Sequence, residues 1–329
     1  MARQLKITVG QYSDKGRKAI NQDFHGVYNP EQPALSSKGI AIALADGISS
    51  SQVSQIASEA TVRGFLMDYY CTSEAWSVKK SVQQVLIATN SWLHSQSHRS
   101  EHRYNKDKGY VCTLSCIVLK STTAHLFHIG DSRIYRLRNN VLEPLTEDHR
   151  SWSSETESHL SRAMGATPQL DIDYQTQALI PGDIFILATD GVYEFVSAEF
   201  ISESINQQEN DLDDSAKRIV EEAFEQGSDD NLTVQIIRID QLPTQNVDEL
   251  YQQLTALPFP PVLEARMVFD GYTIIRSVHA SNRSHVYLAI DNEINDLVII
   301  KTPSVDLQSD PAYLERFLME EWIARRINS

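Results

Sequence analysis

Short apolar or alternating segments recur through most of the chain. Residues 5–12 (LKITVGQY) alternate apolar and polar side chains, whereas 39–45 (GIAIALA) and 183–188 (DIFILA) are almost continuously apolar. Alternation predicts a strand with one buried face, and a short continuous run is typical of a strand covered on both faces. The same patterns predict further strands at 112–120, 124–130, 133–138 and 232–239. We therefore expect the first 240 residues to be rich in β structure.

Segments with helical spacing separate these strands. In 51–70 and 77–94, apolar residues recur every three or four positions, which predicts two amphipathic helices. A second pair is predicted after 183–188, where Ser197 can cap one helix and Asp213 or Asp214 can cap the next, which Gly227 ends. Because strands and helices come in blocks, an α+β fold of packed sheets flanked by helices fits better than an alternating parallel sheet.

The character of the sequence changes after Asp240. Residues 241–268 are polar and Pro-rich, which predicts a linker, and a new alternating pattern begins near Gly271. The remaining piece, 269–329, is too short to bury a full core of its own. We therefore predict a large domain at 1–240, a linker at 241–268 and part of a second domain at 269–329.

The charge balance narrows the expected partners. With 29 basic and 44 acidic residues, the net charge of the chain is −15. Nucleic acids and anionic membranes bind clustered Lys and Arg. We therefore expect cations as partners, rather than nucleic acids or anionic membranes. No segment approaches the roughly 18 apolar residues that a membrane span needs. The three cysteines, Cys71, Cys112 and Cys116, are too few for a disulfide framework and are expected in the core of a cytoplasmic protein.

Aspartates stand where predicted strands begin or end. Asp46 and Asp190 each follow an apolar strand and precede a glycine, while Asp23, Asp131 and Asp230 lie between or just before other strands. Asp-Gly alone is a common turn, so either copy by itself has an ordinary structural explanation. Five aspartates at strand ends can meet at one rim, where they would repel each other unless hard cations such as Mg²⁺ or Mn²⁺ lie between them. Two such ions activate a bridging water toward phosphorus, so the residues favour hydrolysis without a protein nucleophile.

A series of motifs resembles, in order and spacing, those of a known family. The motifs are SDKGRKAINQDF from Ser13, then ALADG, HIGDSRIYRL, SRAMG, LATDG and GSDDNLTV. Over residues 1–240 they resemble the metal-dependent protein phosphatases, the protein phosphatase 2C family, in its bacterial branch. The resemblance implies an αββα four-layer sandwich, with two antiparallel sheets between helix pairs. It also implies hydrolysis of phosphoserine and phosphothreonine in a phosphorylated protein substrate.

The resemblance implies a metal-binding role for each aspartate that matches a family motif. Asp46 resembles the carboxylate that bridges two Mg²⁺ or Mn²⁺ ions, and Gly47 resembles the residue whose carbonyl binds one of them. Asp190 and Asp230 resemble the ligands of the other ion. Asp23 resembles the residue that holds metal-bound water.

Three further residues complete the implied site. Asp131, with Asp190, matches the place of a third ion in bacterial members, although by itself it could be a turn residue that pairs with Arg133. Arg17 resembles the phosphate-binding arginine, whose fork of donors suits two phosphate oxygens, although by itself it would be a solvated surface residue. Asn231 is expected to support the site by hydrogen bonding. The predicted catalytic residues are Arg17, Asp46 and Asp190.

The chain departs from the family pattern at two places. Ile48 and three serines stand where bacterial members usually have Gly-Gly-His, so the general acid is unassigned. Between His149 and Ser161 the chain is shorter than the family's flap over the site, which predicts more open access. We expect His149 and His128 to be structural rather than catalytic. The alternative function is a catalytically impaired binding or regulatory module.

Residues 271–301 resemble the first strands of a bacterial protein kinase. VIIK resembles the nucleotide-binding lysine motif, so Lys301 would be that lysine and Glu320 its ion-pair partner. His279, Ser281 and Ser284 stand where the phosphate loop has glycines, and no catalytic loop follows. The resemblance implies a partial kinase-like N-lobe at the front of a bifunctional phosphatase and kinase. The kinase domain itself is then a candidate partner.

Overall fold

The chain forms two compact units in the computed structural model. The structure describes residues 4–100, 105, 108–152, 158–207, 211–243, 260–304, 313 and 317. The first unit is Met1–Thr244 and the second is Gln245–Ser329.

Two five-stranded antiparallel sheets form the centre of the first unit. One sheet has the order β1 (Lys6–Asp14), β12 (Leu232–Gln241), β11 (Ile184–Ala188), β6 (Arg133–Arg138) and β7 (Val141–Pro144). The other has the order β10 (Asp173–Ala178), β5 (Thr123–Ile129), β4 (Leu114–Lys120), β3 (Ile40–Ala45) and β2 (Phe24–Tyr28). We call them the first and the second sheet.

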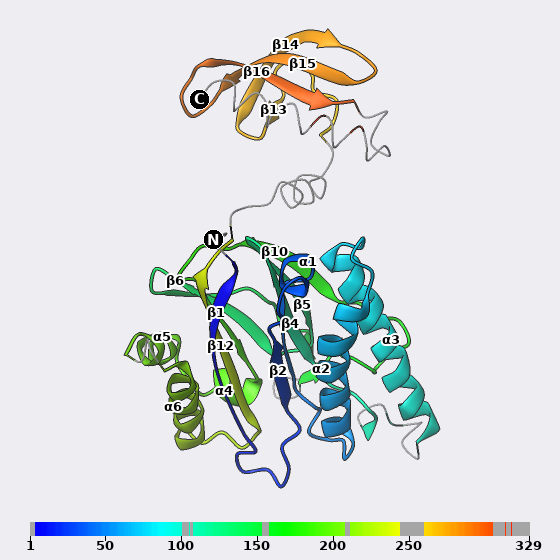
Figure 1. The fold of residues 1–329 in the computed structure, drawn as a ribbon, viewed down its shortest axis with the longest axis vertical. Coiled ribbons are helices and arrows are strands. Elements are labelled where there is room, and N and C mark those ends of the chain that lie inside the picture. The colour runs from blue at the N-terminus through cyan, green and yellow to red at the C-terminus, as the bar shows by residue number, and fades with distance from the viewer. Residues whose placement is uncertain are drawn as a thin grey trace. The chain divides into compact units, whose positions relative to one another are not determined.

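Helix pairs cover the outer faces of both sheets (Figure 1). The pair α2 (Ser54–Cys71) and α3 (Val78–Arg99) packs on the second sheet, and the pair α5 (Ala198–Gln207) and α6 (Leu212–Glu225) packs on the first. Two short helices, α1 (Ala34–Ser37) and α4 (Asp190–Tyr193), and a hairpin of β8 (Arg150–Trp152) and β9 (Ser158–Leu160) complete the unit. This is the predicted order of layers. Within the described part of the chain, no helix is long and apolar enough to cross a membrane.

Strand β3 shows why the apolar runs are continuous. Its isoleucines and Leu44 belong to the apolar cluster between the two sheets, whereas its three alanines belong to the cluster beneath α2 and α3. Successive side chains of a strand point to opposite faces, so a strand inside four layers must be apolar at every position. Burying one Ile or Leu side chain contributes about 1.5–3 kcal/mol, and small alanines let the helices approach closely.

The structure confirms the predicted cap at Ser197, shows a further cap at Ser77 and corrects the cap predicted for α6. Ser77 and Ser197 each accept a hydrogen bond, both of 3.2 Å, from the backbone amide three residues further on. Helix α6, however, is capped by Asp211, which accepts the equivalent bond at 3.0 Å, so the prediction of Asp213 or Asp214 is wrong. The carboxylate of Asp213 is used elsewhere, because it accepts a 2.8 Å hydrogen bond from the backbone of Gln11 in β1.

The three cysteines are free, and two of them are in the core. Cys112 and Cys116 are buried, as predicted, but Cys71 is exposed at the last residue of α2. The prediction that all three are core residues is therefore wrong for Cys71. The position belongs to the outer face of a helix end, which the cysteine count alone does not reveal.

The second unit contains a four-stranded antiparallel sheet. Its order is β13 (Val268–Phe269), β14 (Tyr272–Ala280), β15 (Ser284–Asp291) and β16 (Leu297–Pro303). A small buried cluster contains Ile274, Tyr287, Ala289 and also Leu263, which falls in the predicted linker. Lys301 lies in β16, and Glu320 lies outside the described residues. Several large apolar side chains of this sheet are exposed: Val268, Ile275, Val278, Leu297 and Ile299.

Candidate active site

The sheet registers bring the predicted aspartates to one rim of the sandwich. In the second sheet the first residue of β2 pairs with the last residue of β3, which places Asp23 beside Asp46. In the first sheet the end of β11 pairs with the beginnings of β6 and β12, which places Asp190 near Asp131 and Asp230. Antiparallel pairing therefore gathers five residues that are far apart in the sequence.

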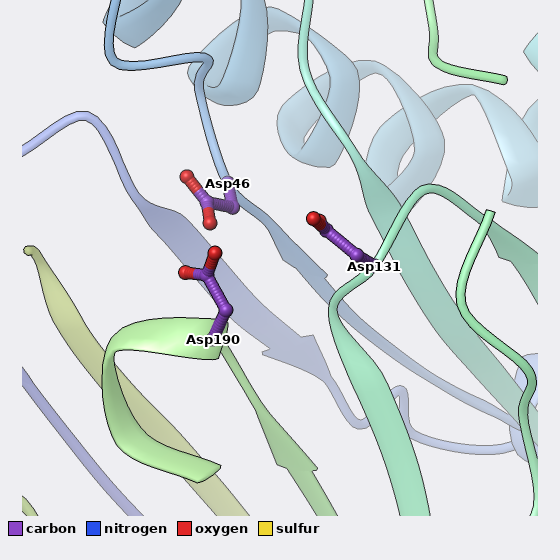
Figure 2. A group of neighbouring side chains, drawn as sticks. All are labelled: Asp46, Asp131 and Asp190. Atoms are coloured by element: carbon purple, nitrogen blue, oxygen red, sulfur yellow. The ribbon is translucent and has the colours of Figure 1, made fainter. Parts of the chain in front are cut away.

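Three of these carboxylates form a compact group. Asp46, Asp131 and Asp190 each offer an oxygen atom, and these oxygens lie within 4.8 Å of one another. Figure 2 shows the Asp46 and Asp190 carboxylates facing each other, with Asp131 approaching from the turn between β5 and β6. They line a cavity of about 320 Å³, together with Asp230 and Glu194.

The backbone around Asp46 is held rigidly. The Asp46 amide donates to the hydroxyl of Thr113 at 3.0 Å, and the Thr113 amide donates to the Asp46 carbonyl at 2.7 Å. A Cβ atom at Gly47 would lie 2.8 Å from Ser54 at the start of α2, closer than such contacts occur. The glycine after Asp46 is therefore required by the packing of α2 against this turn.

Asp23 has one satisfied and one unsatisfied carboxylate oxygen. Its Oδ2 accepts hydrogen bonds from the hydroxyls of Thr233, at 2.6 Å, and Thr189, at 3.2 Å. Its Oδ1 is buried and has no hydrogen-bond partner among the described residues. A buried polar atom without a partner costs about 1–3 kcal/mol, so this oxygen marks a place where a further group belongs.

The crowded carboxylates hold protons more strongly than usual. Burial raises the pKa of Asp23 to about 7, although the Thr233 hydrogen bond opposes this. Burial, and then the charge of Asp23, raise the pKa of Asp46 well above its usual value. Burial, and then the charge of Asp131, raise the pKa of Asp190 to about 7. The ionised forms of these carboxylates are therefore only partly compensated within the site.

The donor set fits hard divalent cations. Carboxylate oxygens are the ligands that Mg²⁺ and Mn²⁺ prefer, and Asp23, whose charge acts on Asp46, keeps a buried Oδ1 without a hydrogen-bond partner among the described residues. A cation would also remove the repulsion that raises the carboxyl pKa values. No His or Cys belongs to the group, so softer metals have no preferred ligand in this part of the chain.

Arg150 also lies in the site, and the sequence analysis missed it. Its Nε donates to Asp131 at 2.7 Å, its Nη2 to Asp190 at 2.8 Å and its Nη1 to Glu194 at 2.7 Å. Asp131 therefore does not pair with Arg133, whose guanidinium donates to both carboxylate oxygens of Asp148 at 2.8 Å. No local signal in the sequence pairs Arg150 with Asp131, because the contact depends on how the segment after β7 returns to the rim.

Lys18 is a second cationic group that the sequence analysis missed. Its Nζ lies 3.3 Å from Asp230 and donates to the hydroxyl of Ser49 at 3.3 Å. Asn231 supports the loop that carries Lys18, as predicted. Its side chain accepts from the amide of Gln22 at 2.8 Å and donates to the carbonyls of two further loop residues, Lys15 and Ile20.

Arg17 points away from the carboxylates in this structure. Its guanidinium donates to the carbonyl of Phe224 at 3.0 Å and to the carbonyl of Ser228, and it stacks on the Phe224 ring at 4.4 Å. It is thus held by the end of α6 and the loop that follows. The structure brings Asp23, Asp46, Asp131, Asp190 and Asp230 to the rim but does not bring Arg17 into the cavity.

Comparison with known proteins places the first unit in a family. The protein phosphatase 2C family model matches residues 11–236. Serine/threonine phosphatase stp of Listeria monocytogenes is 25% identical over 244 residues, which cover 69% of this chain and 94% of that protein. Protein phosphatase PhpP of Streptococcus pneumoniae is 25% identical over 254 residues, which cover 71% of this chain and 98% of that protein.

Solved structures resemble the same part of the chain. The catalytic domain of the serine/threonine protein phosphatase PstP, in complex with two manganese ions, is 25% identical, with a TM-score of 0.58 over 72% of this chain and 100% of that one. Mycobacterium tuberculosis PstP/Ppp, at 24% identity, has a TM-score of 0.59 over 71% and 99%. Since the family model spans more than half of the chain and includes all five aspartates of the rim, the chain belongs to the protein phosphatase 2C family.

Proposed function

We propose that the protein is a metal-dependent protein serine/threonine phosphatase that works with two Mg²⁺ or Mn²⁺ ions. The observation that carries the proposal is the meeting of Asp46, Asp131 and Asp190 beside the unsatisfied oxygen of Asp23. The names of the relatives support the activity and the substrate class. Bound at this rim, the two ions would supply an activated water and neutralise the phosphate.

The proposed ligands divide between the two sheets. Asp46 and Asp190 face each other and line the cavity with Asp230, so these three carboxylates would hold the ions. By the resemblance of the motifs, Asp46 would serve both ions, Asp190 and Asp230 would serve one, and the Gly47 carbonyl would serve the other. Asp23 is fixed by Thr233 and Thr189 through one oxygen, so its other oxygen can orient water. Each of these side chains comes from a strand end or a tight turn, which supports rigid placement.

We also propose Arg17 as the residue that binds the substrate phosphate. Its guanidinium is held by two carbonyl oxygens and one aromatic ring, with no carboxylate among the partners described above. A phosphate oxygen is a stronger acceptor for a guanidinium than a carbonyl is, so substrate can draw Arg17 away from Phe224.

The decisive experiment measures hydrolysis of a phosphothreonine peptide and of a small chromogenic phosphate ester. Activity should be absent in EDTA, return with Mn²⁺ or Mg²⁺ and be insensitive to reagents that block cysteine, since no cysteine lies in the site. Asp171, an exposed aspartate that pairs with Arg162, gives a matched control for Asp→Asn substitutions in the site. The variant Asp171→Asn should keep the activity. Full activity in EDTA would refute the metal mechanism, and metal binding without any hydrolysis would favour the binding module instead.

We further propose that 269–329 is a partial kinase-like N-lobe that follows a phosphatase domain at 1–240 and a linker at 241–268. The antiparallel sheet with Lys301 in β16 supports this, and the Lys301 Nζ lies 5.4 Å from the Phe317 ring centre. Lys301 and Glu320 would position a nucleotide, but phosphotransfer also needs a catalytic Asp and a metal-binding Asp. Truncation after Asp240 should therefore preserve phosphatase activity, and labelled ATP should leave no phosphate on the full chain. Loss of most activity on truncation would contradict the proposed boundary.

A further inference from the structure

Arg150 is a charged group of the acidic site that the proposed mechanism does not use. Its guanidinium forms ion pairs with Asp131, Asp190 and Glu194, all at 2.7–2.8 Å. The Asp131 side chain is only 9% exposed and that of Arg150 is 19% exposed, so their pair is largely shielded from water. Shielded, charge-assisted hydrogen bonds of this length are stronger than surface ion pairs.

The position of Arg150 is fixed by the two residues before it. Asp148 is held by both arms of Arg133, which stacks on the Tyr193 ring at 3.8 Å. The backbone amide of His149 donates to Gly130 at 2.8 Å, and the His149 ring accepts from the Gly130 amide at 3.1 Å. Because Gly130 directly precedes Asp131, these contacts clamp the start of β8 against the turn that carries Asp131.

The guanidinium spans the space between two carboxylates. It donates hydrogen bonds to Oδ2 of Asp131 and to Oδ2 of Asp190. A further cation on this side of the site would need the same two residues as ligands. The Asp46 carboxylate and Asp230, whose Oδ2 lies 3.3 Å from Lys18, receive none of the three Arg150 hydrogen bonds. The Asp131 and Asp190 side of the acidic group therefore already has the Arg150 guanidinium between its carboxylates, whereas on the other side Lys18 pairs with Asp230 and not with Asp46.

The charges of the site support the same division. The five aspartates and Glu194 carry six negative charges when ionised, and Arg150 and Lys18 carry two positive charges. The four negative charges that remain are balanced by two divalent ions. A third ion would leave the site with surplus positive charge while Arg150 stays in place.

We infer that Arg150 is a built-in counter-ion that takes the place of a cation between Asp131 and Asp190, so that the site binds two metal ions and not three. The inference rests on the proposed metal-dependent function, because it concerns how many ions that site accepts. Asp131 is then a partner of Arg150 and not a metal ligand. Removing the guanidinium frees one oxygen of each carboxylate and creates a third cation site.

The test counts bound Mn²⁺ in the full chain by equilibrium dialysis followed by metal analysis. Wild type should bind two equivalents, and Arg150→Ala should bind three. The double variant Arg150→Ala with Asp131→Asn should return to two, because the new site has lost a ligand. Arg63→Ala is the matched control, since Arg63 is an exposed residue of α2 that pairs with Glu59 and its loss changes the net charge equally.

Three outcomes of the dialysis overturn the inference, and they can be told apart. Three equivalents in wild type would show that a cation displaces Arg150. Two equivalents in both wild type and Arg150→Ala would show that Arg150 does not exclude an ion. No bound Mn²⁺ in any of these proteins would refute the proposed function as well.

A second variant keeps the test decisive where Arg150→Ala fails to fold. In wild-type background, Asp131→Asn leaves the guanidinium its pairs with Asp190 and Glu194, so the protein should still bind two equivalents of Mn²⁺. Loss of one equivalent in Asp131→Asn would make Asp131 a metal ligand and overturn the inference. Circular dichroism establishes that each variant is folded before metal is counted.

Discussion

Two groups of titratable side chains in the first unit lead to opposite conclusions about function: one indicates a functional site, and the other indicates a structural role. The acidic site contains Asp23 and Asp46, and a second group, the histidine cluster, contains His128 and His149, whose ring centres lie 4.8 Å apart. Asp23, His128 and His149 are buried, and Asp46 is half-buried. They differ in whether the protein satisfies their polar atoms.

Each ring nitrogen of the histidine cluster has a protein partner. The nitrogens of His128 lie 3.0 Å from the Ser115 hydroxyl and 3.1 Å from the Glu147 carbonyl. His149 accepts from the Gly130 amide, and its other nitrogen lies 2.9 Å from Asp173. The prediction that these histidines are structural is thus supported by their contacts. In the acidic site, by contrast, one oxygen of Asp23 has no partner in the described chain.

Burial acts on both groups but has different consequences. It lowers the pKa of His128 to about 4, because desolvation disfavours the charged ring, and the neutral ring can still donate from Nε2 to the Glu147 carbonyl. It raises the pKa of Asp190 to about 7 for the same reason, but protonated carboxyls would be poor metal ligands. Burial alone therefore does not mark a functional site, whereas burial without internal compensation does.

Loss of a central carboxylate should have the largest effect. Asp46→Asn removes the proposed bridging charge and should lower kcat/KM roughly 1,000-fold or more, because several kcal/mol of metal-derived stabilisation are lost. His128→Asn, in the histidine cluster, should change kcat/KM by less than about tenfold. Steady-state kinetics on the phosphothreonine peptide measures both. The opposite ranking would mean that the distinction between the two groups is wrong.

Metal binding at the acidic site should stabilise the folded protein, and this effect should not depend on the histidine cluster. At a Mn²⁺ concentration of about 100 Kd, the free energy of unfolding should rise by about 3 kcal/mol, and Tm by roughly 5–10 °C. Differential scanning calorimetry with and without EDTA measures the shift. Asp46→Asn should lose it, whereas His128→Asn should retain it. An unchanged wild-type Tm in saturating Mn²⁺ would contradict an uncompensated acidic site.

Substitution of Arg17 tests whether this residue binds the substrate phosphate without taking part in metal binding. Arg17→Ala should lower kcat/KM about 10- to 100-fold, because charge-assisted contacts to phosphate are lost. The Mn²⁺-induced shift in Tm should stay as in wild type, since Arg17 contacts carbonyl oxygens and not the carboxylates. Arg63→Ala controls for the change in charge. If calorimetry shows that Arg17→Ala has lost the metal effect, Arg17 is structural.

The histidine cluster should make stability depend on pH in the acid range. The folded-state pKa of His128, about 4, lies below its ordinary value of 6.5, so the unfolded chain binds more protons between these values. Stability is thus full above pH 6.5 and is lost as the pH falls toward 4. Between pH 7 and pH 5, urea unfolding should show wild type losing about 1–2 kcal/mol more than His128→Asn. Equal losses in the two proteins would show that His128 does not titrate with unfolding.

Local patterns were enough to predict the elements and much of the acidic rim. The apolar run of β3 and the spacing in α2 and α3 reflect periodicities that each segment carries by itself. Asp46 and Asp190 could be recognised because each ends an apolar strand at a glycine. The cap at Ser197 depends on only the three following residues, and its prediction was correct.

The tertiary structure decided which side chains meet at that rim. The separation in sequence is 19 residues between Asp131 and Arg150, 40 between Arg150 and Asp190, and 211 between Arg17 and its carbonyl partner Ser228. A long side chain such as arginine has several rotatable bonds and can reach many acceptors, so its partner depends on how distant segments pack. Strand periodicity determines where a carboxylate can stand in a sheet, but only the assembled sandwich determines which cation, a guanidinium or a metal ion, lies next to it.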